Sequence, residues 1–222
     1  VDGIEQHVEK NGVLPSHILS RTFSFLRSND LIYRPAIKSY MLGETPPAFD
    51  LLYWNGDATG LPGKMTVQYL RWLCQQDQFA QSGITLFGEV LRLSDVTVPF
   101  CAVACETDHI AAWPDSYRGF TKMGSRSKTF ILSQSGHIGG IINPPSKKKY
   151  GHYTNTDMRL SHNEWQDNAA FHEGSWWSRW ESWLRKKSGK LVLSQQPGSE
   201  VFKPLCAAPG TYVLKGKSTF EK

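Results

Sequence analysis

The sequence predicts an α/β fold, in which buried strands alternate with helices along the chain. Residues 98–105 form a near-continuous apolar run, which is typical of a strand buried on both of its faces. A helix is predicted next, because Pro114 suits its first turn and Gly124 suits its end. Residues 129–132 form a second short apolar strand. A strand, a helix and a strand in this order imply a right-handed crossover between parallel strands.

The first part of the chain, up to about residue 80, is predicted to be mainly helix and loop. Capping residues, stop signals and apolar positions at helical spacing indicate several helices there. These are residues 2–10 with Asp2 as the cap and Asn11-Gly12 as the stop, a helix from Ser16, a helix from Leu31 to Gly43, and a helix from Leu61. Pro35 lies inside the third helix, so we expect a late start or a kink there.

Two further elements flank the predicted sheet. Residues 84–93 are typical of a hairpin that turns at Gly88-Glu89. Residues 175–187 predict a last helix with a face rich in tryptophan and with basic residues in its last turn. We interpret this face as packing against the core, and a helix that binds a membrane surface or a partner is the alternative.

Composition and charge narrow the classes of function. The 222 residues are 40% hydrophobic and 20% charged, as in an ordinary globular protein. The net charge of +5 comes without a basic stripe interleaved with aromatic residues, which argues against nucleic-acid binding. No apolar stretch approaches the roughly 18 residues that a membrane span needs.

The four cysteines match no metal-binding spacing and are too few for a disulfide scaffold. A reducing cytoplasm is therefore the expected environment. Cys101 and Cys105 lie four residues apart in the first apolar strand, so both are predicted to be small buried residues on one face of it.

An acid and a histidine follow the two predicted parallel strands. The first strand leads to Asp108, and the second leads to a glycine-rich loop that contains His137. Because the carboxyl ends of parallel strands meet at one edge of a sheet, we expect these side chains to lie within hydrogen-bonding reach. An acid and then a histidine also end the α/β-hydrolase triad, in which the histidine takes a proton and the acid fixes its tautomer. A helix cap and a surface histidine are the alternative interpretations.

The nucleophile of such a triad is missing from the sequence. No serine or cysteine lies in a G-x-S-x-G or G-x-C-x-G elbow. The chain also begins with Val1 instead of a methionine. Either the protein is not an enzyme of this type, or the nucleophile is expected upstream of Val1. His109 would point away from Asp108 in an extended chain, so it is interpreted as structural, with support of the site as the alternative.

Several segments carry a more specific signal than spacing alone. They are residues 22–32, Phe49-Asp-Leu-Leu-Tyr-Trp-Asn-Gly-Asp-Ala-Thr59, Asp108-His-Ile-Ala-Ala-Trp113, Ser135-Gly-His-Ile-Gly-Gly-Ile-Ile-Asn-Pro-Pro145 and residues 172–177. In sequence, order and spacing these segments resemble class I polyhydroxyalkanoate synthases, and the likeness runs from about residue 2 to residue 187. The sequence departs from the family pattern at Glu106-Thr107, Ala112 and Pro35.

The resemblance implies the C-terminal portion of an α/β-hydrolase fold with a mainly helical cap subdomain. Members of this family polymerise (R)-3-hydroxyacyl-CoA into polyester and release CoA, using a cysteine nucleophile in a lipase-like box. That box is expected upstream of Val1. Asp108 and His137 match the catalytic acid and histidine of the family. No metal or redox cofactor is implied.

The resemblance also implies an organisation and a set of partners. The expected domains are a helical connector and cap over residues 1–80, the C-terminal half of the core over residues 81–190, and a tail over residues 191–222. In the cap, Trp54 and the turn at Asp57 are expected to gate substrate access or to form a dimer contact, or simply to pack the cap. A cytoplasmic homodimer at the surface of polyester granules is expected. The basic residues 147–149 are interpreted as a solvated loop, with binding of CoA phosphates as the alternative.

Two other functions remain open from the sequence. The first is another α/β-hydrolase activity, an esterase or thioesterase, which would use Asp108 and His137 but transfer the acyl group to water. The second is a non-catalytic module associated with granules. Without the nucleophile, the 222 residues by themselves are predicted to be inactive.

Overall fold

The computed structural model describes residues 1–26, 28–45, 57–208 and 210–211 of the chain. These residues divide into two compact units, Val1–Trp177 and Ser178–Lys222. The first unit contains a helix-rich part and a sheet with its own aromatic core, and the second unit follows that sheet in the sequence.

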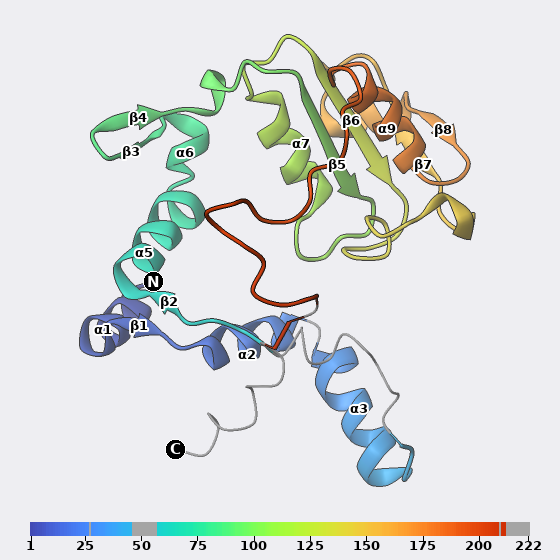
Figure 1. The fold of residues 1–222 in the computed structure, drawn as a ribbon. Coiled ribbons are helices and arrows are strands. Elements are labelled where there is room, and N and C mark those ends of the chain that lie inside the picture. The colour runs from blue at the N-terminus through green and yellow to red at the C-terminus, as the bar shows by residue number, and fades with distance from the viewer. Residues whose placement is uncertain (27, 46–56, 209, 212–222) are drawn as a thin grey trace. The chain divides into compact units, whose positions relative to one another are not determined.

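The helix-rich part of the first unit agrees with the predicted helices in outline (Figure 1). Its elements are α1 (Asp2–Asn11), β1 (Val13–Leu14), α2 (Ser16–Leu26), η1 (Asn29–Tyr33), α3 (Arg34–Ala36), η2 (Ile37–Met41), β2 (Leu61–Pro62), α5 (Gly63–Tyr69), η3 (Leu70–Gln75) and α6 (Gln78–Gln81). Here η1, η2 and η3 are π-helical turns. Helix α1 ends at Gly12, whose φ of 72° is the left-handed conformation that glycine adopts freely.

Two local expectations in this part need correction. Asp2 does not cap α1, because the N-cap is Val1 and Asp2 lies in the first turn, where its carboxylate pairs with Arg71. Pro35 does not delay the helix, because helical turns run from Asn29 to Met41 without a break. Pro35 lies in the first turn of α3 between two π-helical turns. A proline lacks the N–H that would close the regular hydrogen bond, and wider turns flank it in the structure.

Helices α1 and α5 pack closely because α5 begins with a glycine. A Cβ atom at Gly63 would lie 2.7 Å from Cβ of Val8, so no larger residue fits without a shift. The buried Val8 and the antiparallel pairing of β1 with β2 complete this contact. On its polar side, Arg71 forms ion pairs with Glu5 and Asp2.

The predicted hairpin is confirmed, but its turn lies at Phe87-Gly88 instead of Gly88-Glu89, because Glu89 already pairs in the second strand. β3 (Ile84–Leu86) and β4 (Glu89–Leu91) pair antiparallel, with Leu86 opposite Glu89. The two residues between them, Phe87 and Gly88, have φ values of 52° and 86°. Positive φ at both central positions is the conformation of the tight turns that match the twist of a hairpin.

The central element of the first unit is a four-stranded mixed sheet in the order β5-β6-β7-β8 (Figure 1). Its elements and those that connect them are η4 (Leu93–Asp95), β5 (Phe100–Cys105), α7 (Trp113–Thr121), β6 (Lys128–Ser133), η5 (Pro145–Lys147), β7 (His152–Thr154), α8 (His162–Asp167) and β8 (Ala170–His172). β5 and β6 are parallel, as predicted, and α7 is the helix between them. β7 and β8 continue the sheet antiparallel, which the sequence did not predict.

An aromatic core packs between the sheet and its helices. Because side chains alternate along a strand, Ala104, Phe130 and Leu132 point to the same face of the sheet. Residues of α7 and α8 cover this face, namely Trp113, Tyr117, Phe120 and Trp165. The Tyr117 and Phe130 rings meet edge to face with centroids 5.0 Å apart, a favourable aromatic geometry.

Around residue 177 the chain passes from the first unit into the second. In the first unit, the indole N–H groups of Trp176 and Trp177 donate to the carbonyls of Gly140 and Ile141, each at 2.9 Å. Helix α9 (Trp177–Arg185) is shorter than predicted and contains no buried residue. Trp180 and Leu184 are 41% and 40% exposed.

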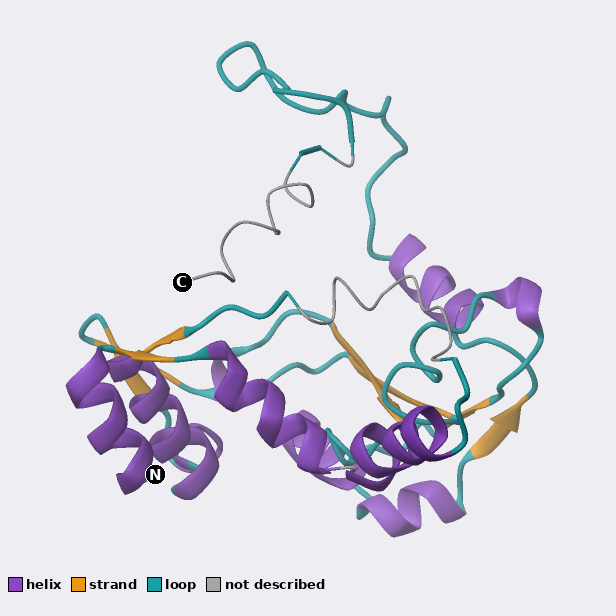
Figure 2. Ribbon diagram, turned by 90° about the horizontal axis from the view of Figure 1, so that it is seen from below, coloured by secondary structure: helices purple, strands orange, loops and turns teal. Residues whose placement is uncertain are grey.

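Beyond α9 the described chain runs as loop, without helix or strand (Figure 2). Its apolar side chains are exposed, including Leu191, Leu193 and Leu205. Among the described residues no helix is long and apolar enough to cross a bilayer.

Candidate active site

The carboxyl ends of β5 and β6 lie side by side, and the chain beyond them stays connected. The parallel ladder continues past both strands, because Glu106 N–H donates to the Ser133 carbonyl at 2.8 Å and Thr107 N–H donates to the Ser135 carbonyl at 3.1 Å. The loop that carries Asp108 is thus hydrogen-bonded to the loop that carries His137. The parallel crossover therefore positions both residues at one edge of the sheet.

Asp108 and His137 form a hydrogen-bonded pair. His137 Nδ1 lies 2.9 Å from Asp108 Oδ2 and 3.1 Å from Oδ1. A carboxylate only accepts hydrogen bonds, so Nδ1 carries the proton and donates it. In this tautomer Nε2 has the lone pair that can accept a proton from another group.

The pair is anchored at the acid and open at the histidine. The Asp108 side chain is 8% exposed, whereas that of His137 is 46% exposed. Asp108 Oδ1 also accepts hydrogen bonds from the backbone N–H groups of Ile110 at 2.8 Å and Ala111 at 2.9 Å. The carboxylate is therefore fixed by the turn that follows β5, and the imidazole is accessible to solvent.

Hydrogen bonds decide the ionisation of Asp108. Burial by itself would raise the pKa of this carboxyl group, but the bonds from Ala111 N–H, His137 and Ile110 N–H outweigh burial and lower the pKa below its ordinary value. The group is therefore an anion at neutral pH. An anion at this position holds the imidazole in one tautomer and stabilises its protonated form.

Cys105 lies close to the pair but has the wrong properties for a nucleophile. Cys105 is only 1% exposed. Burial, and to a smaller extent the negative charge of Asp108, raise the pKa of its thiol to about 11. The thiolate, which is the attacking form, is therefore scarce at neutral pH. The predicted burial is confirmed for Cys105, whereas Cys101 is only partly buried.

The remaining residues that the sequence pointed to are not part of this pair. His109 is exposed, and the hydrogen bonds of Asp108 come from Ile110, Ala111 and His137 instead. Asp57 is exposed and lies shortly before β2. Trp54 lies outside the described residues.

Sequence reasoning missed the groups that hold the His137 loop in place. Gln134 accepts a hydrogen bond from Gly151 N–H at its side-chain Oε1, at 2.9 Å. The Ser133 hydroxyl and the Trp176 indole both donate to the Gly140 carbonyl, at 2.9 Å each. These contacts join residues that lie 7 to 36 positions apart in the sequence, and no local pattern marks them. Only the contact between Gln134 and Gly151 follows from the register of β6 against β7.

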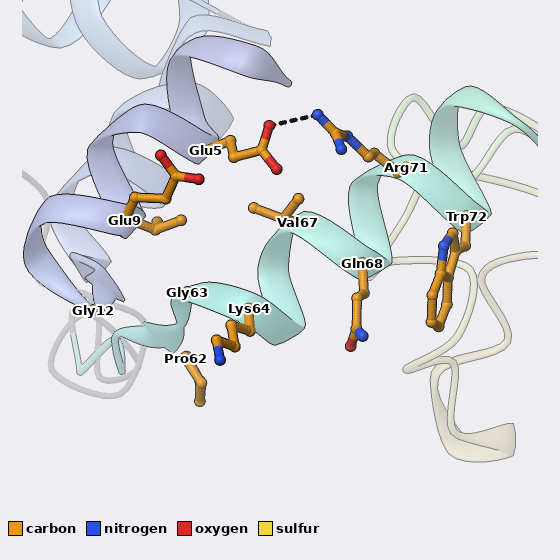
Figure 3. A pocket seen from close by; sticks show the side chains of 11 residues that line it. Glu5, Glu9, Gly12, Pro62, Gly63, Lys64, Val67, Gln68, Arg71 and Trp72 are labelled. Atoms are coloured by element: carbon orange, nitrogen blue, oxygen red, sulfur yellow. Dashed lines mark hydrogen bonds and ion pairs between the residues drawn. The ribbon is translucent and has the colours of Figure 1, made fainter. Parts of the chain in front are cut away.

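Of the hollows lined by described residues, we consider two that lie elsewhere in the first unit. The first, of about 770 Å³, is an open groove between α1 and α5, in which Glu5 points toward Arg71 beside the apolar side chain of Val67 (Figure 3). The second, also of about 770 Å³, lies beside Lys128, at the end of β6 opposite to His137. Neither hollow is lined by Asp108 or His137.

Comparison with known proteins places the chain in a family. No protein-family model matches it. It is 39% identical over 197 residues to the poly(3-hydroxyalkanoate) polymerase subunit PhaC of Cupriavidus necator, an alignment that covers 88% of this chain and 33% of that protein.

Two further relatives agree. The chain is 32% identical to the poly(3-hydroxyalkanoate) polymerase subunit PhaC of Rhizobium etli, over 96% of this chain and 33% of that protein. It is 35% identical to poly(3-hydroxyalkanoate) polymerase 2 of Ectopseudomonas oleovorans, over 96% of this chain and 38% of that protein. Such relatives imply an α/β-hydrolase-type fold, with which the parallel strand pair and its crossover helix agree.

The chain spans about a third of the length of these relatives. Within that third, the alignments cover 96% of this chain. The chain therefore belongs to the poly(3-hydroxyalkanoate) polymerase family.

Proposed function

We propose that this chain supplies the acid and the histidine of a polyhydroxyalkanoate synthase, which polymerises (R)-3-hydroxyacyl-CoA into polyester. The observation that carries the proposal is the hydrogen bond from His137 Nδ1 to the ionised, anchored Asp108, in a chain related to named polymerases. The arrangement leaves Nε2 of an exposed imidazole for proton transfer. The nucleophile in this proposal is a cysteine that lies outside these 222 residues.

The proposed reaction begins with acyl transfer to that cysteine. Nε2 of His137 accepts the thiol proton, and the thiolate attacks the carbonyl carbon of the acyl-CoA thioester. A new carbon–sulfur bond to the enzyme forms, and the bond to CoA breaks. The proton on His137 then passes to the CoA thiolate, which leaves as the thiol. Asp108 stabilises the imidazolium while it carries the proton.

Chain extension uses the same histidine. The 3-hydroxyl group of a hydroxyacyl unit gives its proton to Nε2 of His137 as its oxygen attacks the acyl-enzyme carbonyl. An ester bond forms, the cysteine thiolate leaves, and the imidazolium returns the proton to it. Each cycle thus adds one ester linkage and regenerates the thiol. No proton leaves or enters the site in the sum of these steps.

The finer organisation belongs to the same proposal. We assign residues 1–80 to a helical connector and cap, residues 81–190 to half of the catalytic core, and residues 191–222 to a tail. The predominance of helix before α6 and the sheet after it support this division. We further propose a homodimer that works in the cytoplasm at the surface of polyester granules. Its substrates are the acyl-CoA and the growing polyester chain.

The experiment replaces the histidine in a polymerase that contains this segment. His137→Ala is expected to lower polymer formation by about a thousandfold or more, because the nucleophile loses its base. His109→Ala is the matched control, since it removes an exposed neighbouring imidazole, and it should keep near-normal activity. The 222-residue chain alone should release no CoA from 3-hydroxybutyryl-CoA.

The reaction products distinguish a synthase, which transfers the acyl group to a hydroxyl group, from a hydrolase, which transfers it to water. Polymer with stoichiometric CoA supports the synthase, whereas free 3-hydroxy acid with CoA indicates transfer to water and an esterase or thioesterase. Near-normal polymer yield from His137→Ala, with the fold intact by circular dichroism, would refute the assignment of the histidine.

A further inference from the structure

Residues 174–177, which we call the strap, join the end of β8 to the loop that follows β6. The strap begins at Gly174, whose carbonyl accepts a hydrogen bond from Nδ1 of the buried His152 at 3.0 Å. His152 lies in β7, so this bond fixes the start of the strap to the sheet. At its other end, the indole N–H groups of Trp176 and Trp177 donate to carbonyls of the loop after β6. The strap therefore links the antiparallel half of the sheet to the candidate active site.

His137 lies inside a single helical turn of that loop. Gly140 N–H donates to the Gly136 carbonyl at 3.0 Å, and Ile142 N–H donates to the Ile138 carbonyl at 2.8 Å. These two bonds close the backbone around His137. The imidazole itself is 46% exposed, so side-chain packing can hold it only in part. The direction in which the imidazole points therefore depends on how firmly this turn is held.

The strap binds two consecutive carbonyls of this turn. The Trp176 indole donates to the Gly140 carbonyl and the Trp177 indole donates to the Ile141 carbonyl, each at 2.9 Å. The two indole rings meet edge to face, at an interplanar angle of 74°, which lets neighbouring residues reach neighbouring carbonyls. Two points of attachment fix the orientation of a backbone segment as well as its position.

The hydrogen bond from Trp176 lies in a buried site. Trp176 is 8% exposed, and the Gly140 carbonyl accepts a second bond from the Ser133 hydroxyl at 2.9 Å. A carbonyl oxygen has two lone pairs, and both are occupied here. Removing the indole N–H would leave one of them unsatisfied in a buried site, which favours a shift of the turn toward water.

We propose that Trp176 and Trp177 are positioning residues for His137. Through the two carbonyls, the strap holds the helical turn so that Nδ1 of the imidazole stays in line with the Asp108 carboxylate. The kinetic consequence rests on the proposed polymerase function. The geometric consequence, the hydrogen bond from His137 to Asp108, does not depend on which reaction the site catalyses.

The first test measures the tautomer of His137 in the 222-residue chain. The tautomer of a histidine is set by the hydrogen bonds of its ring nitrogens, and the bond to Asp108 keeps the proton on Nδ1. Proton–nitrogen correlation NMR spectra distinguish a proton on Nδ1 from one on Nε2 at about pH 8.5, above the ordinary pKa of an imidazole. Trp176→Phe, which removes the indole N–H and keeps an aromatic ring, should move a large part of the population to the Nε2 form. An unchanged tautomer would overturn the proposal.

Trp165→Phe is the matched control. Trp165 is fully buried in the aromatic core, and its Nε1 has no hydrogen-bond partner among the described residues. The same substitution there should lower the urea midpoint, because it leaves a cavity, and should keep the His137 tautomer of the wild type. Should Trp176→Phe fail to fold, Trp177→Phe breaks the neighbouring bond at a partly buried position and carries the same expectation.

The second test measures turnover in a polymerase that contains this segment. Trp176→Phe and Trp177→Phe should each lower kcat by about tenfold and leave KM unchanged, because they misplace a catalytic group without touching the substrate. Trp165→Phe should keep a kcat near that of the wild type at a temperature where all three variants are folded.

The outcomes separate positioning from stability. If kcat falls in Trp165→Phe as much as in Trp176→Phe, or follows the unfolding midpoint across the three variants, the strap only stabilises the fold and the positioning role is refuted. If His137 proves dispensable for turnover, the proposed function fails. The tautomer comparison of Trp176→Phe with Trp165→Phe then still decides whether the strap positions the imidazole.

Discussion

At the scale of single residues, the ionisation of Asp108 connects the site to the stability of the fold. Hydrogen bonds from two backbone N–H groups and from His137 lower its pKa in the folded protein. In the unfolded chain these bonds are absent, and an aspartate titrates near pH 4. A carboxyl whose pKa is lower when folded stabilises the fold above its unfolded value. That contribution is lost as the pH falls through the folded pKa.

Asp108→Asn should therefore change how stability depends on pH. The free energy of unfolding of the wild-type chain, measured with urea, should fall between about pH 5 and pH 3, and that of the variant should fall less steeply there. Asp77→Asn is the control, because Asp77 is an exposed carboxylate with φ of 48°, which asparagine tolerates. Parallel pH profiles for wild type and Asp108→Asn would contradict the role of these hydrogen bonds in the fold.

The sequence was sufficient to predict the Asp108–His137 pair, but it did not predict the residues that hold the His137 loop in place. Asp108 and His137 each follow a long apolar strand, and the parallel crossover brings such strand ends together whatever the details of packing. Gln134 and Gly151, which hold the start of the His137 loop, meet only because β7 returns antiparallel to β6 in one register. That register depends on contacts between distant residues, and neither strand alone specifies it.

Among the secondary-structure elements, β5 packs closely against the loop that follows β6, and Gly140 lies at this contact. A Cβ atom at Gly140 would lie 2.6 Å from Sγ of Cys105 and 2.6 Å from the Gln134 carbonyl oxygen. The carbonyl oxygen is backbone and cannot rotate away, so the loop itself would have to move. Gly140 is thus required by the close approach of two chain segments.

Gly140→Ala is expected to destabilise the chain by about 1–3 kcal/mol, as other insertions into packed sites do. In a polymerase that contains this segment, it should also lower turnover, because the loop carries His137. Gly119→Ala is the matched control. Gly119 lies within α7 with nothing within 4 Å of an added Cβ, so alanine should stabilise that helix by about 0.5–1 kcal/mol. Thermal unfolding of Gly140→Ala and Gly119→Ala measures both effects. Equal changes in the stability of the two variants would contradict the packing argument.

The strands of the sheet that the sequence predicts are longer than those that it does not predict. β5 and β6 are each six residues long, β5 is apolar throughout and β6 has the apolar run Phe130–Leu132 at its centre, so their pattern stands out. β7 and β8 are three residues each and contain His152 and His172, so they carry little apolar pattern. β7 is a strand because it pairs with β6, and β8 is a strand because it pairs with β7. Hydrogen bonding to a neighbour, rather than local preference, forms these elements.

At the scale of the whole molecule, the two units differ in how much apolar surface they bury. The first unit contains the aromatic core, with Phe130, Leu132 and Trp165 fully buried. In the second unit, Leu191 and Leu205 are 98% and 101% exposed. Burial of apolar surface is the main favourable contribution to folding, so the first unit should determine the measured stability.

A pair of leucine substitutions tests this difference. Leu132→Ala should lower the free energy of unfolding by about 2–5 kcal/mol, because it leaves a cavity in the core. Leu205→Ala makes the same chemical change at an exposed position and should alter it by less than about 0.5 kcal/mol. Denaturant unfolding monitored by tryptophan fluorescence compares them. A large loss from Leu205→Ala would mean that the second unit shares in a core.

The predicted domain boundaries at residues 80 and 190 stay a prediction. Compactness separates the chain at Trp177, inside the region that the sequence assigns to the core. The sequence shows no signal there, because Trp176 and Trp177 begin an apparently continuous amphipathic helix. Their indole groups bind the carbonyls of the loop after β6, and this contact is what ties residue 177 to the sheet.

The ladder that continues past β5 and β6 has one more consequence. The amide of Thr107 is bonded to the Ser135 carbonyl and that of Glu106 to the Ser133 carbonyl. Moving the two loops apart as backbone segments would break these bonds. The deuterium uptake of these two amides therefore reports how often the loops that carry Asp108 and His137 separate from each other.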